Sequence, residues 1–482
     1  MVSDDENPRR NLSRRAPGWA VVAALAFAGL SSAFMFTLVV PLQSELPILL
    51  DASREDTSWV VTITLLVAAV ATPISGRLGD MYGKRRVILF LLLALIIGSL
   101  VAAVSHSIVG VIIGRGLQGI TTGVIPLGIA VMRDVLPPAR LGTAVAFMSA
   151  TMGVGGAVGM PVAAFVAENY DWHALFWMSL ALGVIGLAAI WSIVPEDTLL
   201  SPGRLDVLGA LGLAVGLAGL LLYVSQGSAW GWGSPLSIGS VTLGVVALLA
   251  WGAYQLRTRE PLVDLRVAAR PAVLMTNLAA IGMGFALFGS NVSFPQLLEL
   301  PAETGVGFGL TMMQAALCIM PSGLIMMLLS PLSGRLEKLF GPRPLFTIGS
   351  ASIVVAYAFV LLWSSEVWHI VVANCIIGVG IAFSFAAMPM IIMRAVPSNE
   401  TGVSNGLNAL FRSVGTSSAS AVMGGVLAAM SIPAGDVAIP TSAAFATCFW
   451  IAIAAAVVAT VLTLFIPRST PDAERAAIPP RG

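Results

Sequence analysis

The chain has 482 residues, of which 57% are hydrophobic and only 10% are charged, and its formal net charge at pH 7 is +1. Soluble proteins carry roughly 25% charged residues, so this composition excludes a water-soluble globular protein and indicates an integral membrane protein. A net charge this close to zero also argues against a nucleic acid as a partner. The three cysteines, Cys318, Cys375 and Cys448, lie in apolar runs without CxxC spacing, which indicates packing residues rather than a disulfide framework or a metal site.

The first apolar run begins at about residue 18, after a polar segment that contains four arginines. It is too long for the apolar core of a signal peptide and no small-residue cleavage site follows it, so we expect an uncleaved first helix. Because about 20 apolar residues span a bilayer as a helix, the later runs predict thirteen more such helices. A β-barrel is excluded because its segments would be short and alternating. The fourteen predicted helices are 18–42, 57–77, 86–105, 108–132, 141–167, 173–194, 205–225, 237–256, 272–297, 308–332, 344–363, 367–393, 402–430 and 441–466.

Basic residues are distributed unevenly over the connections between these helices. If both termini lie in the cytoplasm, the seven outside connections contain a single basic residue, Arg54, whereas every inside segment contains at least one. Cytoplasmic loops carry such an excess of Lys and Arg. The pattern therefore predicts an even number of spans with both termini cytoplasmic. The expected outside connections are 43–56, 106–107, 168–172, 226–236, 298–307, 364–366 and 431–440.

One stretch occurs twice in the chain. Residues 73–85 and 331–343 share Pro, Ser, Gly, Arg, Leu, Gly and Arg at the same spacing, and each copy lies between two apolar runs. Matched elements in the two halves of an apolar chain are typical of a duplicated transporter. The copies lie eight predicted helices apart, so a duplicated six-helix unit requires two additional helices between the halves.

The predicted organisation has six parts. They are a cytoplasmic tail (1–17), a six-helix bundle (18–195), two additional helices (196–256), a cytoplasmic amphipathic linker (257–271), a second six-helix bundle (272–466) and a cytoplasmic tail (467–482). Charged and apolar residues alternate in the linker, which is compatible both with a helix lying on the inner leaflet and with a solvated connection.

The first copy of the repeat resembles motif A of the major facilitator superfamily, although Met81 stands where that family normally has a basic residue. The fourteen-helix arrangement is similar to that of the drug:proton antiporter branch of the superfamily. The resemblance implies an all-α membrane fold of two six-helix bundles plus two extra central helices, with motif A taking part in gating. The gating residues that it implies are Gly76, Asp80, Gly83, Lys84, Arg85, Arg86, Gly334, Arg335, Gly341 and Arg343.

Motif A also has a physical interpretation. Asp80 lies at the inner end of the second predicted helix, where we expect a neighbouring helix N-terminus or an arginine to hold its carboxylate. The alternative is that the basic cluster after it only fixes the topology. In the second copy, Glu337 stands one residue away from the usual acidic position.

The fourth predicted helix resembles motif B, whose Arg and Gln-Gly are matched by Arg115, Gln118 and Gly119. An arginine at membrane depth costs about 2.5–17 kcal/mol, depending on the reference state, so Arg115 is expected to face the bundle interior or water. The resemblance implies a part in proton coupling or cavity gating. The alternative is a structural arginine that is bonded to backbone carbonyls.

The fifth predicted helix resembles motif C, the antiporter motif, in part. Gly155, Gly159 and Pro161 match it, but Met160 interrupts the expected Gly-Pro pair. Small residues at this spacing let two helices approach closely, so we expect a role in helix packing. The departure leaves the mode of transport open.

Carboxylates are missing where a pump for cations would need one. No Asp or Glu lies near the middle of any predicted span, and the places of an Asp and an Asn in the first helix of the antiporter branch fall on Ser32 and Thr37. A pump for hydrophobic cations commonly uses a buried carboxylate as counter-charge and proton carrier. Neutral, anionic or lipid-like substrates are therefore favoured over cationic drugs.

The thirteenth predicted helix carries Asn405, Asn408, Arg412 and Thr416 on one face. Arg412 lies well inside the span and is expected to face inward. It is expected either to attract an anionic group of a substrate or to pair with a carboxylate near the inner rim. A hydrogen-bond network that packs helices is the alternative.

In the superfamily, the first and fourth helices of each half line the central cavity. The resemblance adds Arg115, Gln118, Asn408 and Arg412 as candidates for proton coupling or the cavity. Aromatic and Met side chains beside a few polar groups suit a roomy, adaptable site. The substrate-cavity candidates are Phe34, Thr37, Phe288, Asn291, Phe383 and Met388.

The sequence contains no Walker A motif, no HExxH and no nucleophile constellation, so neither an ATP-driven pump nor an enzyme is expected. We expect a secondary transporter that exports small amphipathic compounds, such as drugs, by proton-coupled alternating access. The proton gradient supplies the energy and no cofactor is expected. Membrane lipid is the other expected partner, and the protein is expected to be a monomer in a bacterial cytoplasmic membrane. Two alternatives stay open: an exporter of lipid or cell-envelope intermediates, and a non-transporting membrane scaffold or sensor.

Overall fold

The computed structural model describes residues 17–39, 42, 46–196, 203, 205–397, 400–434 and 437–467. The predicted terminal tails therefore fall almost wholly outside the described residues. Within the described ranges the chain is built from long helices, with one two-stranded sheet.

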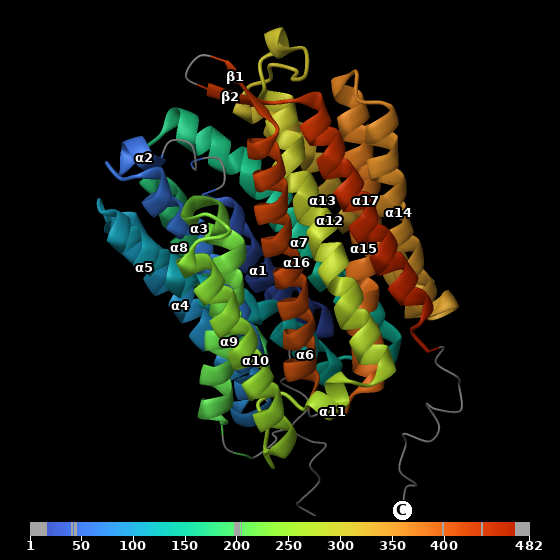
Figure 1. Cartoon of the computed structure of the whole chain (residues 1–482). Coiled ribbons are helices and arrows are strands. Elements are labelled where there is room, and N and C mark those ends of the chain that lie inside the picture. Colours follow the sequence, from blue (N-terminus) through green and yellow to red (C-terminus); the bar gives the residue numbers. More distant parts are fainter. Residues whose placement is uncertain are drawn as a thin grey trace, which may run out of the picture.

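The long helices form two bundles and a connecting pair (Figure 1). The N-terminal bundle consists of α1 (Gly18–Thr37), α3 (Arg54–Tyr82), α4 (Lys84–Val104), α5 (Ile108–Gly119) continued by η3 (Ile120–Gly123) and α6 (Val124–Val135), α7 (Pro138–Asn169) and α8 (His173–Ile193). The C-terminal bundle consists of α12 (Pro271–Glu299), α13 (Met312–Phe340), α14 (Pro342–Leu362), α15 (Val367–Ala395), α16 (Thr401–Ala429) and α17 (Ser442–Leu464). The connecting pair is α9 (Val207–Trp230) and α10 (Pro235–Arg257). Every predicted helix is present, and most ends lie within a few residues of the predicted ones.

Hydropathy explains most of these helices but not α16. In the described part of the chain, 13 helical segments are long and apolar enough to cross a bilayer, with α5 to α6 counted as one. α16 has 29 residues but is rich in Asn, Ser, Thr and Gly. It packs against α12 of its own bundle and against α3 and α9, and Figure 1 shows it running between them. A helix shielded from lipid by neighbours needs less apolar surface.

The fourth predicted helix, 108–132, is interrupted in the structure. A 3₁₀ turn, η3, separates α5 from α6. Pro126 has no N–H to donate to the carbonyl of Thr122, which removes one α-helical hydrogen bond at this turn. A missing bond of this kind does not by itself break a helix, since Pro161 lies inside the continuous helix α7. The neighbouring Thr121 carbonyl accepts from the N–H of Val124 and from the hydroxyl of Ser32, 3.2 Å away on α1. Hydropathy alone could not show this break because every residue in it is compatible with a membrane helix.

Each bundle has its own apolar core. Leu25 and Phe176 are fully buried in the N-terminal bundle, and Phe294 and Tyr357 are fully buried in the C-terminal bundle. Inside a bilayer, lipid tails are as apolar as these side chains, so close packing and interhelical hydrogen bonds hold the bundles together. The hydrogen bond from the Tyr357 hydroxyl to the Ala286 carbonyl, 2.5 Å long, is one such contact between α14 and α12.

The connecting pair α9–α10 packs on the place where the two bundles meet. Leu213, Leu217 and Leu221 of α9 share one buried cluster with Ala69 of α3 and Leu407 of α16. At the other end of α9, the amide of Gln226 donates to the Ser58 hydroxyl of α3 over 3.1 Å. The pair therefore touches both bundles along one side, as Figure 1 shows with α9 beside α3 and α16.

The linker between α10 and α12 is docked rather than lying along a leaflet. Its helical part, α11, covers only Leu265–Ala268. Leu262 and Val263 are buried in the same cluster as the α9 leucines, which anchors the linker to the protein core. Of the two alternatives for 257–271, the structure shows neither a long helix nor a fully solvated connection: only Leu265–Ala268 is helical, and Leu262 and Val263 pack inward.

Three short elements were not predicted by hydropathy: α2 (Leu46–Leu49), η4 (Ala302–Thr304) and a hairpin of β1 (Ser431–Ala434) and β2 (Val437–Pro440). The strands pair antiparallel with Ser431 opposite Pro440. The hairpin lies at the end of the molecule opposite to α11 (Figure 1). We call the end that holds the α3–α4 turn and the α13–α14 turn the basic end.

The start of α9 is fixed by one buried carboxylate. Asp206 accepts from the Gly209 N–H at 2.7 Å, from the Tyr254 hydroxyl at 3.1 Å and from the Gln255 amide at 2.8 Å. We expect Asp206→Ala to lower the free energy of unfolding by about 2–3 kcal/mol, because it removes an N-cap and leaves buried donors without an acceptor. Thermal unfolding in detergent, with exposed Glu303→Ala as control, measures this; equal losses in both variants would contradict the assignment.

Candidate functional site

At the basic end, the carboxylate of Asp80 is placed against the N-terminus of α16. Asp80 is 2% exposed, and its Oδ2 accepts from the backbone N–H of Val403 at 3.1 Å. A carboxylate at a helix N-terminus is stabilised by the free N–H groups and by the helix dipole. This contact joins α3 of the N-terminal bundle to α16 of the C-terminal bundle, and we call it the α3–α16 junction.

Lys84, which follows directly after the turn, connects this junction to the end of α6. Its Nζ lies 2.7 Å from Oδ2 of Asp134 and 3.9 Å from Oδ1 of Asp80, and the residue is 1% exposed. The other two basic residues of the cluster differ from it. Arg85 donates to the carbonyl of Trp191 at 2.5 Å, whereas Arg86 is exposed. Only Lys84 of the three therefore takes part in the junction.

The repeated glycines have two distinct structural roles. Gly83 and Gly341 end α3 and α13 with φ angles of 103° and 82°, a left-handed conformation that favours glycine. Gly76 and Gly334 lie where helices of different bundles cross. A methyl group at Gly76 would lie 2.7 Å from the Gly402 carbonyl oxygen, and one at Gly334 would lie 2.5 Å from the Cα of Thr143.

The second copy of the repeat makes a similar contact with the other bundle. Glu337 of α13 is 3% exposed, and its Oε1 lies 2.5 Å from a guanidinium nitrogen of Arg394 at the end of α15. Its Oε2 faces Gly142, the fifth residue of α7, where a methyl group would lie 2.6 Å away. The one-residue shift of the acidic position thus still brings the carboxylate close to the start of a helix of the other bundle. We call this contact the α7–α13 junction.

A further internal match explains the symmetry of the junctions. The segment Met132-Arg133 is followed by Gly142 at the start of α7, and Met393-Arg394 is followed by Gly402 at the start of α16. The guanidinium of Arg133 donates to Thr401 and, at 3.4 Å, to the carbonyl of Val396. Sequence reasoning missed Arg133 and Arg394, although this weak second repeat was a usable signal.

Two arginines of the second copy, Arg335 and Arg343, also lie at the basic end. Arg335 is exposed, whereas Arg343 donates to the carbonyls of Thr463 at 3.3 Å and Leu464 at 2.5 Å. Next to the α3–α16 junction, burial and the nearby Asp264 carboxylate raise the pKa of Glu400 above its usual value. The basic end thus contains acidic groups as well as the basic residues that mark it in the sequence.

Arg115 lies in the interior of the N-terminal bundle and is saturated with acceptors. Its guanidinium donates to the Met35 carbonyl at 2.7 Å, to Gln118 Oε1 at 2.9 Å and to the Val60 carbonyl at 3.3 Å. The Gln118 amide in turn donates to the Ser99 hydroxyl at 2.9 Å. This network connects α5 to α1, α3 and α4. It is the geometry expected for an arginine that is bonded to backbone carbonyls and holds helices together.

The polar stripe of α16 divides between two neighbours. The Asn408 amide donates to Asn277 Oδ1 of α12 at 3.0 Å, and the Asn405 amide returns to the Thr401 carbonyl at 3.0 Å. Arg412 points elsewhere: its guanidinium carbon lies 4.8 Å from the centre of the Phe385 ring of α15. The asparagines therefore pack helices, while the arginine faces an aromatic wall.

The motif on α7 packs against α1. A methyl group at Gly155 would lie 2.5 Å from Cβ of Ala33, and one at Gly159 would lie 2.1 Å from Oγ1 of Thr37. Pro161 is buried within the continuous helix α7. These glycines thus permit a close crossing of two helices, as small residues do in membrane bundles.

A small central cavity lies between the two bundles, with a volume of about 110 Å³. Thr37, Asn291, Ser322 and Phe385 contribute its polar and aromatic wall. Drug-sized sites occupy roughly 300–1,000 Å³, so the cavity must widen before it can enclose such a molecule. The other lining residues are Met152, Gly153, Gly156, Ala157, Met160, Leu287, Ile319, Gly323, Met326, Gly378 and Ile381.

The cavity differs in part from the predicted one. Thr37 and Asn291 line it, whereas Phe34 and Met388 are buried in the cores of their bundles and Phe288 and Phe383 are partly buried outside its wall. Most of the lining instead comes from α7 and α13, since Gly153 and Gly323 bring these helices into contact. The signal was the series Met152, Gly153, Gly156, Ala157 and Met160 on one face of a helix.

Comparison with known proteins agrees with this architecture. The family model described as Major Facilitator Superfamily matches residues 25–420. The chain belongs to the major facilitator superfamily. As a member it is a multi-pass membrane transporter and not an enzyme, and the predicted superfamily and fold are confirmed.

Relatives in the superfamily span most of the chain. The chain is 29% identical to the MFS-type transporter YhcA of Bacillus subtilis over 366 residues. The aligned region covers 74% of this chain and 68% of YhcA. The chain is 25% identical over 410 residues to the lincomycin resistance protein LmrB of Listeria monocytogenes, covering 84% of this chain and 86% of LmrB. The crystal structure of the human organic anion transporter MFSD10 superposes with a TM-score of 0.65 at 16% identity, covering 93% of this chain and all of that one.

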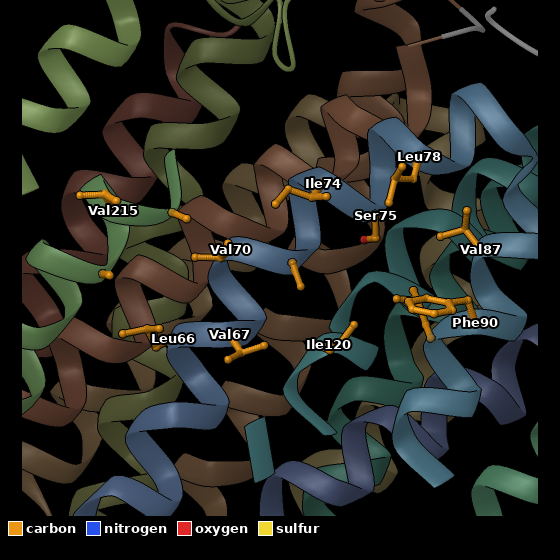
Figure 2. A pocket seen from close by; sticks show the side chains of 14 residues that line it. Leu66, Val67, Val70, Ile74, Ser75, Leu78, Val87, Phe90, Ile120 and Val215 are labelled. Atoms are coloured by element: carbon orange, nitrogen blue, oxygen red, sulfur yellow. The ribbon is translucent and has the colours of Figure 1, made fainter. Parts of the chain in front are cut away.

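This superfamily member also has a groove that faces away from the central cavity. Figure 2 shows it between α3, α4, η3 and α9, with a volume of about 500 Å³. Its lining is apolar except for Ser75, whose hydroxyl is already bonded to the Thr72 carbonyl at 2.8 Å. The groove therefore offers hydrocarbon contact and no free polar group to orient a polar solute. The remaining lining residues are Leu66, Val67, Val70, Ala71, Ile74, Leu78, Val87, Phe90, Leu91, Ile120, Ala214, Val215 and Ala218.

Proposed function

We propose that this transporter exports small amphipathic compounds by proton-coupled alternating access. The single observation that carries the proposal is the pair of junctions at the basic end, each placing a carboxylate of one bundle close to the start of a helix of the other. Two matched closures around a central cavity are what a bundle-rocking mechanism requires at one of its two ends.

The orientation follows from the distribution of charge. We propose that the basic end faces the cytoplasm, because Lys and Arg gather on the cytoplasmic side of membrane proteins. With α16 counted as a span beside the 13 apolar segments, the chain crosses the membrane fourteen times and both termini are cytoplasmic. Bacterial relatives support the cytoplasmic membrane of a bacterium as the location.

Drug efflux is supported by one relative, whose name records resistance to lincomycin. Proton coupling requires a group that changes charge, and the carboxylates Asp80 and Glu337 are buried in the junctions. Protonation of either carboxylate weakens its attraction to a helix N-terminus. We propose that this step releases the basic end, and that Arg115 holds α1, α3 and α5 together while the bundles move.

Reconstitution of the purified protein in proteoliposomes tests the function. Flux of lincomycin, phenylnaphthylamine and anilinonaphthalene sulfonate is measured with and without an imposed pH gradient. We expect gradient-dependent flux of at least one compound, abolished by a protonophore. Flux that ignores the gradient would contradict proton coupling, and the absence of flux for a wide panel would favour a scaffold or sensor.

The apolar groove favours a second candidate, an exporter of lipid or cell-envelope intermediates. A groove of about 500 Å³ without a free polar group suits a hydrocarbon chain better than a polar drug. Gradient-dependent transfer of a fluorescent phospholipid between leaflets, without flux of the small compounds, would support this candidate over the first.

A further inference from the structure

Two arginines, Arg115 and Arg412, lie in the interior of the helix bundles and differ in their hydrogen-bond partners. The Arg115 guanidinium is 1% exposed and donates to two carbonyls and to Gln118. Within the described ranges, no hydrogen bond or ion pair reaches the guanidinium of Arg412, whose recorded contact is the ring of Phe385. Arg115 thus has three acceptors within the protein, whereas Arg412 has none among the described residues.

The depth of Arg412 makes this difference matter. It lies eleven residues after Thr401, the first residue of α16 (412 − 401), which places its Cα about 16 Å along the helix at 1.5 Å per residue. That is near the middle of a hydrocarbon core roughly 30 Å thick. A charge at this depth must face water or a partner of opposite charge, and a contact with one aromatic ring replaces only part of its hydration.

The carboxylates of the protein are occupied elsewhere. Asp80 is bonded to the start of α16, Asp134 to Lys84, and Glu337 to Arg394, all at the basic end. The described helices carry no Asp or Glu near their midpoints that could neutralise Arg412. Among the described residues, Arg412 therefore has no carboxylate partner.

Phe385 connects Arg412 to the central cavity, although Arg412 is not itself one of the residues that line it. The ring forms part of the cavity wall, together with Asn291 and Thr37, and the guanidinium lies against that ring. Arg412 is partly buried rather than sealed into the core. With Arg412 behind the Phe385 ring, and with Asn291, Thr37, Met152, Met160 and Met326 in the wall, a widened cavity would pair charge with adaptable apolar surface.

We propose that the compounds exported through this cavity are amphipathic organic anions and that Arg412 binds their anionic group. A carboxylate, sulfonate or phosphate accepts charge-assisted hydrogen bonds from a guanidinium. The hydrophobic body of the substrate then lies against the methionines and Phe385. The proposal rests on the proposed export function and names its substrate class.

A matched pair of probes tests the charge separately from the hydrophobic body. Anilinonaphthalene sulfonate and phenylnaphthylamine share one aromatic skeleton and differ in the sulfonate. Equilibrium binding of both is measured to the full-length protein in nanodiscs, for the wild type, Arg412→Gln, Arg412→Lys and the control Arg259→Gln. Arg259 is exposed just after α10. Its variant therefore changes the net charge by the same amount as Arg412→Gln, but at a site far from the cavity.

We expect Arg412→Gln to weaken binding of the sulfonate about tenfold or more, because a charge-assisted hydrogen bond is lost, and to change binding of the neutral probe less than twofold. Arg412→Lys should retain part of the affinity, and Arg259→Gln all of it. Equal losses for both probes would assign Arg412 to structure and overturn the proposal. An unchanged affinity for the sulfonate, or no saturable binding of it by the wild type, would overturn it too.

The binding measurement is independent of transport. If the wild type binds the sulfonate through Arg412 but shows no gradient-driven flux, proton-coupled export fails while the substrate class stands. If flux occurs for the neutral probe alone, export stands and the anionic class fails.

Discussion

Asp80→Asn is expected to lower gradient-driven flux about tenfold or more while leaving the protein folded. Asn keeps the shape of the side chain but removes the charge that faces the N–H groups of α16 and the ammonium of Lys84. Hydrogen bonds to charged groups contribute about 1.5–3 kcal/mol, so the closed basic end loses roughly ten- to hundredfold in its equilibrium population. Flux in proteoliposomes with an imposed pH gradient measures the effect.

The matched control is Asp51→Asn, at an exposed position with a φ angle of 45° that Asn also tolerates. Thermal unfolding of both variants separates a loss of function from a loss of fold. Wild-type flux in Asp80→Asn would show that the α3–α16 junction is not part of the transport cycle.

Gly76→Ala and Gly334→Ala are expected to open the basic end. The added methyl groups would meet backbone atoms of the opposite bundle at 2.7 Å and 2.5 Å, and backbone cannot yield as a flexible side chain can. Overpacking of this kind costs about 1–3 kcal/mol, and only the closed arrangement bears it. Spin labels on Tyr82→Cys and Lys338→Cys, both exposed at the basic end, should report longer distances in a background without the native cysteines.

Gly424→Ala provides the comparison for these two variants. A methyl group there would meet nothing within 4 Å, so the variant gains the helix propensity of alanine without a clash. We expect its distance distribution to match that of the parent. If Gly424→Ala shifted the spin-label distances as much as Gly76→Ala, helix propensity rather than the clash at the helix crossing would explain the effect.

The sequence allowed the helices to be predicted well, and the reasons for the exceptions are local. Apolar runs determine where a chain enters and leaves a bilayer, so α4 and α8 end within a residue or two of their predicted limits. The break at η3 includes a bond that Pro126 cannot make and a Thr121 carbonyl bonded to Ser32 of α1, neither of which hydropathy registers. The polar helix α16 was predicted with the other runs, as 402–430, although its composition is too polar to count among the 13 apolar segments.

The site was predictable where it depends on local geometry or on repetition. The repeat pointed to Asp80 and to the turn glycines Gly83 and Gly341, which have positive φ. The partners of the interior arginines were not predictable, because the carbonyls that saturate Arg115 belong to Met35 and Val60, 80 and 55 residues away. In sequence, Arg115 and Arg412 look alike, and only the tertiary structure distinguishes a satisfied charge from an unsatisfied one.

The connecting pair has a further consequence for how molecules reach the interior. α9 lies over the line where α3 meets α16, whereas no described helix from outside the bundles packs on the corresponding line between α7 and α13. A solute dissolved in the bilayer therefore meets a covered contact line between α3 and α16 and an uncovered one between α7 and α13. We therefore expect molecules from the leaflets to reach the central cavity along α7 and α13. A photoreactive substrate analogue should label these helices, and should spare the residues of α3 and α16 that α9 covers, such as Ala69 and Leu407.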